Sequence, residues 1–242
     1  MSRRRFFVPE IRRGTAELTG AEAEHLVRVL RVEPGQIYEV SDNQNLYLAE
    51  IETARKSVVS FQIREKLSPP APGVQVTLAA ALIKFDRFEW LIEKATELGV
   101  AVIQPFEAAR SERGLAQAAG KRLARWTKVA LESSQQSRRV HLPVIRDWVR
   151  FVKAVQEPAD VRLFLDEASG APPVLEILPP GRTASDRVAL LLGPEGGWTD
   201  EERQQAVSAG WQPCSLAQTV LRAETAGIAA LSLIQAEWRS AR

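Results

Sequence analysis

The residues best suited to chemistry lie in two short loops near the C-terminal end of the chain. The first loop, residues 193–197, reads GPEGG and places the carboxylate of Glu195 among three glycines. Glycine has no side chain, so another molecule can approach this backbone closely. The second loop carries Arg222 and Glu224. A carboxylate can accept a proton and an arginine can stabilise a negative charge, so the two loops predict a binding site with acid–base groups.

The segments beside these loops indicate how they are positioned. Val188 to Leu192 is a continuous apolar run, typical of a strand buried on both faces. Thr199 and Glu202 have the spacing of a capping box, which begins a helix. The first loop therefore follows the carboxyl end of a buried strand, where open α/β sheets bind ligands. A second strand, loop and small-residue helix are predicted over residues 212–234.

A third pair of charged residues could reach the same cleft. Residues 161–165 predict another buried strand, and Asp166 and Glu167 follow its carboxyl end. They could equally cap the next segment. None of these loops has the Gly-Lys-Ser/Thr or GxGxxG pattern of a phosphate loop, which argues against a nucleotide-binding regulator. Each loop, taken alone, is also compatible with an ordinary α/β crossover.

Taken together, LLLGPEGGWTDEE and LAQTVLRAETA resemble the RsmE family, which methylates N3 of a uridine in 16S ribosomal RNA. FEWLIEKATELGV in the middle of the chain, and RRFFV and HLVRVLR near its start, are also similar to that family. The family belongs to the SPOUT superfamily. The resemblance implies an α/β fold with a small N-terminal PUA-like β-barrel, followed by a SPOUT α/β domain with a C-terminal trefoil knot.

The resemblance also implies a cofactor, S-adenosylmethionine, and roles for individual residues. Arg222 is expected to stabilise the uracil anion, and Glu195 or Glu224 to accept or orient the N3 proton. Glu224 also has a purely structural explanation, since an acid is favourable where a helix begins. No metal is expected, because two histidines and one cysteine provide few ligands. The expected cofactor-binding residues are Leu192, Gly193, Pro194, Glu195, Gly196, Gly197, Leu216, Leu221, Thr225 and Ala226.

The second loop departs from the family at two positions. The family commonly shows Gly-x-Arg-Ile-Leu-Arg, and this chain has Ala217 and Thr219 where the glycine and first arginine stand. Three functions therefore remain open: methylation of uridine 1498 at N3, methylation of another RNA position (ribose 2′-O or base), and non-catalytic RNA binding in ribosome assembly. The retained GPEGG and R-x-E-T-A motifs argue against the last.

A proline-rich stretch at residues 69–73 predicts a stiff linker between two domains. Residues 1–68 contain several short strand patterns and one helical segment, Ala21–Leu30, which is typical of a small barrel. The resemblance identifies this part as a PUA-like RNA-binding domain. Strands and helices alternate from residue 74 to residue 242, which predicts a parallel sheet covered by helices.

Arginines expected to contact RNA occur in both predicted domains. Arginine suits phosphate contacts through its planar fork of donors. Crowding in the N-terminal part favours RNA binding over an ordinary solvated surface, whereas helix-end charge explains Arg138 equally well. These arginines are Arg3, Arg4, Arg5, Arg12, Arg13, Arg28, Arg31, Arg110, Arg113, Arg138 and Arg139.

Composition is that of an ordinary globular protein, with 45% apolar and 26% charged residues among 242. The 32 basic and 30 acidic residues balance too closely to indicate nucleic acid by net charge. The single cysteine, Cys214, lies in an apolar segment and is expected in the core, without a disulfide. No apolar stretch suits a membrane span or an export signal, so we expect a cytoplasmic protein. The resemblance implies a homodimer that acts on the small ribosomal subunit, consistent with the small-residue face of Ala223–Ile234.

Overall fold

The computed structural model describes residues 4–71, 73–168 and 170–240. By their contacts these residues form two compact units. The first contains Met1–Ala71 and Ser134–Leu142, and the second contains Pro72–Ser133 and Pro143–Arg242. Arg3, an expected RNA contact, and Pro72 of the expected linker lie outside the described residues.

The first unit is a five-stranded sheet with one helix. Its strand order is β1-β3-β4-β5-β2, with β1 parallel to β3 and the other neighbours antiparallel. Phe6, Leu18 and Phe61 fill its core, together with Ala23 and Leu26 from the helix. The elements are β1 (Arg5–Phe7), β2 (Thr15–Thr19), α1 (Gly20–Arg28), β3 (Ile37–Ser41), β4 (Leu46–Arg55) and β5 (Val58–Leu67).

A segment from the middle of the sequence completes this unit. Hydrogen bonds fix Ser134–Leu142 to the end of β3: Ser41 Oγ donates to the carbonyl of Val140 at 2.6 Å, and Asn43 Oδ1 accepts from the amide of Leu142 at 2.7 Å. Arg5 donates to the carbonyl of Arg138. The first unit is therefore assembled from two separate stretches of the chain.

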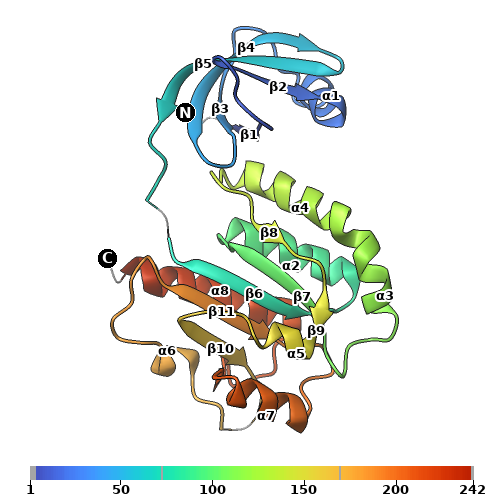
Figure 1. The fold of residues 1–242 in the computed structure, drawn as a ribbon, viewed down its shortest axis with the longest axis vertical. Coiled ribbons are helices and arrows are strands. Elements are labelled where there is room, and N and C mark those ends of the chain that lie inside the picture. The colour runs from blue at the N-terminus through green and yellow to red at the C-terminus, as the bar shows by residue number, and fades with distance from the viewer. Residues whose placement is uncertain (1–3, 72, 169, 241–242) are drawn as a thin grey trace. The chain divides into compact units, whose positions relative to one another are not determined.

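The second unit is built on a parallel sheet with the order β12-β10-β11-β6-β7-β8, and β9 also pairs with β7 (Figure 1). The strands are β6 (Gln75–Ala81), β7 (Val102–Glu107), β8 (Val144–Ile145), β9 (Val149–Arg150), β10 (Val161–Leu165), β11 (Arg187–Leu192) and β12 (Gln212–Cys214). The expected α/β fold is confirmed. The N-terminal part, expected as a small β-barrel, is a β half-barrel, and a parallel-sheet domain follows it.

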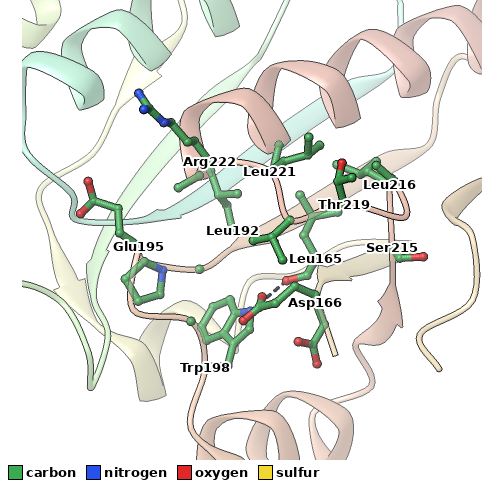
Figure 2. Close-up of a pocket in the computed structure, with 18 of the residues that line it drawn as sticks. Leu165, Asp166, Leu192, Glu195, Trp198, Ser215, Leu216, Thr219, Leu221 and Arg222 are labelled. Carbon is green, nitrogen blue, oxygen red and sulfur yellow. Dashed lines mark hydrogen bonds between the residues drawn. The ribbon is translucent and has the colours of Figure 1, made fainter. Parts of the chain in front are cut away.

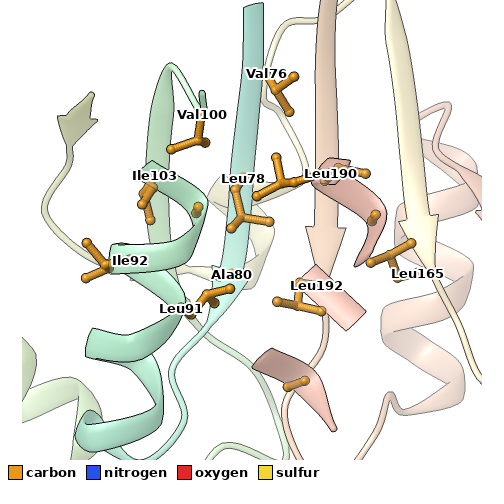
Figure 3. Close-up of a cluster of buried hydrophobic side chains, with 14 of the residues drawn as sticks. Val76, Leu78, Ala80, Leu91, Ile92, Val100, Ile103, Leu165, Leu190 and Leu192 are labelled. Carbon is orange, nitrogen blue, oxygen red and sulfur yellow. The ribbon is translucent and has the colours of Figure 1, made fainter. Parts of the chain in front are cut away.

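Helices cover both faces of this sheet. They are α2 (Phe85–Glu97), α3 (Leu115–Ala119), the 3₁₀ turn η1 (Gly120–Arg122), α4 (Leu123–Gln136), α5 (Phe151–Ala154), α6 (Val174–Ile177), α7 (Asp200–Ser208) and α8 (Ala223–Ser240). Leu190 and Leu192 of β11 pack in one cluster with residues of α2, α4 and α8, and Figure 3 shows part of it. Leu191 packs on the other face with Phe151 and Trp198. The apolar run of β11 is thus buried on both faces, as predicted.

Two helix starts differ in how they are capped. The predicted capping box is confirmed at α7, where the Thr199 side chain accepts from the amide of Glu202 and the Glu202 carboxylate accepts from the amide of Thr199. Helix α2 begins after Lys84 and has no side-chain cap. Asp86 lies in the first turn, where its charge complements the helix dipole.

Helix α8 approaches the sheet very closely at one glycine. A Cβ at Gly227 would lie 2.9 Å from side-chain carbons of both Leu192 and Leu91. Any larger residue would push α8 away from β11 and α2, so this glycine sets the distance at which the helix packs. Among the helices of the described ranges, none has the length and apolar character needed to cross a bilayer.

Candidate active site

Three loops meet at the carboxyl edge of the parallel sheet and enclose a cavity of about 310 Å³. The loops follow β10, β11 and β12, which are neighbours in the sheet. Figure 2 shows Leu165, Leu192, Leu216 and Leu221 around this cavity. A second hollow of about 410 Å³ adjoins it and shares residues of the loops after β10 and β12, Glu167 among them. The strand ends therefore place residues far apart in sequence around one binding space.

The glycine loop after β11 is held by close packing. A Cβ at Gly193 would lie 2.8 Å from the Trp198 ring, and one at Gly197, where φ is +68°, only 2.5 Å from Glu167 Oε1. Trp198 is 1% exposed, and its indole Nε1 donates to the carbonyl of Leu165 at 2.8 Å, the dashed line in Figure 2. Because the loops after β10 and β11 are locked together here, the wall of the cavity is rigid.

Two carboxylates lie at the end of β10. Asp166 is buried and accepts two hydrogen bonds from Arg203, at 2.8 and 3.1 Å. This pairing raises the pKa of Arg203. The Glu167 side chain is 42% exposed and lies 3.9 Å from the same guanidinium. Both acids line the cavity, as the sequence suggested for residues at this strand end.

Charged groups of both signs lie at another part of the cavity. Arg87, from the first turn of α2, forms an ion pair with Glu195, with Nη1 and Oε1 2.5 Å apart. Arg222 is exposed, and its side chain forms no hydrogen bond or ion pair with the residues that the structure describes. In the view of Figure 2, Glu195 and Arg222 lie at the same end of the cavity, opposite Ser215 and Leu216. An anionic group bound here would find a cation that is free to interact with it.

The cavity gathers most of the residues expected to bind a ligand, but not all. Gly196 packs against Arg110, which donates to its carbonyl at 3.1 Å, and Thr225 is exposed on α8. Glu224 is 6% exposed in the first turn of α8, does not line the cavity, and its Oε2 has no hydrogen-bond partner among the described residues. The expected residues that do line it are Leu192, Gly193, Pro194, Glu195, Gly197, Leu216, Leu221, Arg222 and Ala226.

Several cavity residues were not singled out from the sequence, Arg87 and Trp198 among them. Arg87 belongs to an amphipathic helix remote from the loops, and nothing in its local pattern distinguishes it from a surface arginine. Trp198 follows the glycine loop directly, and a large aromatic residue after glycines was the available signal. Both contact the glycine loop, Arg87 through Glu195 and Trp198 through Gly193.

The arginines expected to bind RNA are in different environments. Arg4, Arg12, Arg13, Arg28 and Arg31 are exposed in the first unit, and Arg110 and Arg113 are exposed in the second. The Arg5 side chain is only 7% exposed and pairs with Glu39 at 2.7 Å, so it stabilises the pairing of β1 with β3. Burial lowers the pKa of Arg139 to about 10.

Over residues 4–71, 73–168 and 170–240, no group of three or more His, Cys, Asp or Glu side chains could hold a metal ion. Cys214 is fully buried, as expected, and burial raises the pKa of its thiol to about 12. It therefore remains protonated at neutral pH and forms part of the core.

Family models and known proteins are similar to this chain over nearly its whole length. A model described as an RNA methyltransferase domain matches residues 69–235, and one described as an RNA methyltransferase PUA domain matches residues 18–63. Ribosomal RNA small subunit methyltransferase E of Bacillus subtilis is 33% identical over 91% of this chain and 89% of its own length. The Synechocystis protein of the same name is 33% identical over 98% of this chain and 78% of its own length.

A solved structure shows the same fold. Ribosomal RNA small subunit methyltransferase E from Neisseria gonorrhoeae, bound to S-adenosyl methionine, superimposes with a TM-score of 0.87. It is 29% identical, and the match covers 98% of each chain.

Proposed function

We propose that this chain, which belongs to the ribosomal RNA small subunit methyltransferase E family, transfers a methyl group from S-adenosylmethionine to N3 of uridine 1498 in 16S ribosomal RNA. The observation that carries this proposal is the cavity at the ends of β10, β11 and β12, with Arg222 and Glu195 among its lining residues. The cavity combines a space for a cofactor with charged groups that could bind and deprotonate a uracil ring.

The cavity fits the proposed cofactor. Its volume of about 310 Å³ lies within the roughly 300–1,000 Å³ of small-molecule sites. Leu192, Leu216 and Leu221 offer apolar contacts to an adenine ring, while Gly193 and Gly197 leave the backbone accessible to polar groups. Glu167 adds a carboxylate to the lining, which suits a cofactor that carries positive charge. When bound, S-adenosylmethionine supplies an electrophilic methyl group.

The charged residues divide the remaining work. N3 of uracil carries a proton and is a poor nucleophile until that proton is removed, so a base is needed. Glu195 is our candidate, because it lines the cavity and Glu224 does not. Arg222 is free of an acidic partner among the described residues and would stabilise the negative charge on the ring oxygens.

The remaining features of the proposal concern RNA and assembly. Residues 1–68 act as a PUA-like RNA-binding domain through their exposed arginines, and residues 74–242 form a SPOUT domain that follows the linker at 69–73. Helix α8 follows the edge strand β12 and packs on β11, β6 and α2, and we propose that this part of the chain forms the trefoil knot that the family resemblance implies. We also propose that Ala223–Ile234 contributes to a homodimer and that the enzyme acts on small ribosomal subunits in the cytoplasm.

The direct test is methyl transfer from labelled S-adenosylmethionine to small ribosomal subunits that lack the modification. Label in 3-methyluridine at position 1498 is the expected result. Label in a 2′-O-methyl nucleoside or at another base would show that the chain is a methyltransferase with a different target position. RNA binding without label would favour an assembly factor, the function that the Thr219 substitution leaves open. Arg222→Ala should keep its affinity for the cofactor and lose most of its turnover. Full activity of this variant would refute the role of Arg222.

A further inference from the structure

The ion pair between Arg87 and Glu195 joins two elements that are distant in the sequence. Arg87 lies in the first turn of α2, and Glu195 lies in the glycine loop that follows β11. Nη1 and Oε1 are 2.5 Å apart, and the two side chains are 34% and 32% exposed. Ion pairs this exposed contribute little to folding stability, so stability does not account for the placement of Arg87.

The pair occupies only one oxygen of the carboxylate. Oε1 of Glu195 accepts the hydrogen bond from Arg87, and Oε2 accepts none from the residues that the structure describes. Both side chains line the cavity. Arg87 therefore holds the carboxylate at the cavity and leaves one oxygen available to a bound molecule.

Packing of the glycine loop fixes the backbone at Glu195, and Arg87 is the residue that holds its side chain. The Glu195 side chain is 32% exposed, and its hydrogen bond comes from Arg87. Arg87 belongs to a helix anchored by Phe88 and Leu91, which are both fully buried. Groups on a packed helix keep their positions better than groups on a loop. The helix can thus fix, through Arg87, the orientation of the Glu195 carboxylate.

We propose that Arg87 is a positioning residue that holds Glu195 with Oε2 directed at the N3 proton of the target uracil. This inference rests on the proposed function. The proton passes from N3 to Oε2, and the electron pair of the N3–H bond stays on nitrogen. That pair forms the bond to the methyl carbon as the carbon–sulfur bond breaks, with its electrons going to sulfur. Glu195 then releases the proton to solvent. A proton acceptor must lie within hydrogen-bond reach of its proton, so orientation decides the rate.

A double-mutant cycle tests whether Arg87 acts through Glu195. The variants are Arg87→Ala, Glu195→Gln and their combination, measured by single-turnover methyl transfer at saturating cofactor and RNA. Glu195→Gln should lower the rate by about 10²–10⁴-fold, as removal of a general base does. Arg87→Ala should lower it by about 10–10²-fold through misplacement of the carboxylate, with the KM for RNA unchanged. In the Glu195→Gln background, Arg87→Ala should cause no further loss.

Two further variants and a pH series complete the design. Arg87→Lys keeps the charge and should recover part of the rate. The matched control is Arg187→Ala, which removes an arginine that pairs with Asp160 at 3.0 Å at the other end of β11, and it should leave the rate unchanged. The rates of Arg87→Ala and Glu195→Gln should rise more steeply with pH than the wild-type rate. Without a well-placed carboxylate, the reaction depends on uracil that has already lost its N3 proton to solvent, and this fraction grows with pH. Calorimetric cofactor affinity confirms that each variant is folded.

The outcomes separate this inference from the proposed function. Equal loss from Arg87→Ala in both backgrounds, or a loss confined to the KM for RNA, would show that Arg87 contacts RNA and would overturn the inference alone. Wild-type activity of Glu195→Gln would overturn the inference and the choice of Glu195 as the base, but not methyl transfer by the chain. Absence of methyl transfer by the wild-type chain would overturn the proposed function and this inference with it.

Discussion

Gly193→Ala is a sharp test of how tightly the glycine loop is packed. The added Cβ would lie 2.8, 2.9 and 3.1 Å from three atoms of the Trp198 indole. To regain an ordinary contact of 3.4 Å, the ring must move by about 0.6 Å. Its neighbours prevent this, since the centroids of Phe164 and Phe151 lie 4.8 and 5.6 Å from that of Trp198.

The cost follows from overpacking and from one weakened hydrogen bond. Forcing a methyl group into a packed interior costs about 1–3 kcal/mol. Displacing Trp198 also strains the bond from its Nε1 to the carbonyl of Leu165, worth about 1 kcal/mol. The second unit should therefore lose about 2–4 kcal/mol of unfolding free energy. This loss lowers its thermal unfolding midpoint by roughly 5–15 °C. Cofactor affinity should fall as well, because Gly193 and Trp198 both line the cavity.

Urea unfolding followed by tryptophan fluorescence measures this loss in the second unit, since all six tryptophans belong to it. The matched control is Gly120→Ala. Gly120 has a helical φ of −57°, and no heavy atom lies within 4 Å of an added Cβ. That change should be neutral or add about 0.4–1 kcal/mol. A Gly193→Ala midpoint equal to the wild type's would show that the indole moves freely and would refute the reasoning.

Three further predictions concern charge and burial. Arg203→Ala leaves the carboxylate of Asp166, 5% exposed, without its partner and should cost about 3 kcal/mol in urea unfolding; an unchanged midpoint would contradict it. Hydrogen bonds from Thr183 hold the pKa of Asp186 below 3.8, so its stabilising contribution is present above about pH 4 and is lost as pH falls through the lower folded value. Asp186→Asn should flatten the stability–pH curve in that acid range, and an unaltered curve would count against this role. Cys214, whose pKa is raised by burial to about 12, should resist thiol reagents at pH 8 in the native protein, and rapid labelling would contradict its burial.

Local patterns in the sequence predict much of the fold. Strand β10 has the bounds predicted for it, Val161–Leu165, because a short run rich in Val, Leu and Phe is bounded by Asp160 and Asp166. The capping box at Thr199 is equally local. Strand β2, Thr15–Thr19, has a mixed polar sequence that does not indicate a strand by itself, and its pairing with β5 depends on tertiary contacts.

The site could be predicted where its residues follow strands and not where they come from elsewhere. The glycine loop and Arg222 are found from sequence because they follow the carboxyl ends of strands. Arg87 lies 108 residues from Glu195, and only the packing of α2, α8 and β11 in one apolar cluster brings them together. Glu224 stands two residues from Arg222 in the motif, but it does not line the cavity, because it is buried in the first turn of α8.

The two-part construction of the first unit affects how a nascent chain matures. Its last strand, β5, ends at Leu67, but the segment that bonds to Ser41 and Asn43 ends at Leu142. At about 5–20 residues per second, synthesis of the roughly 75 residues between them takes about 4–15 s. During that interval the β sheet can form, yet Ser41 and Asn43 still lack their partners. The N-terminal unit is therefore not finished first, and its completion waits for the ribosome to translate well into the following unit.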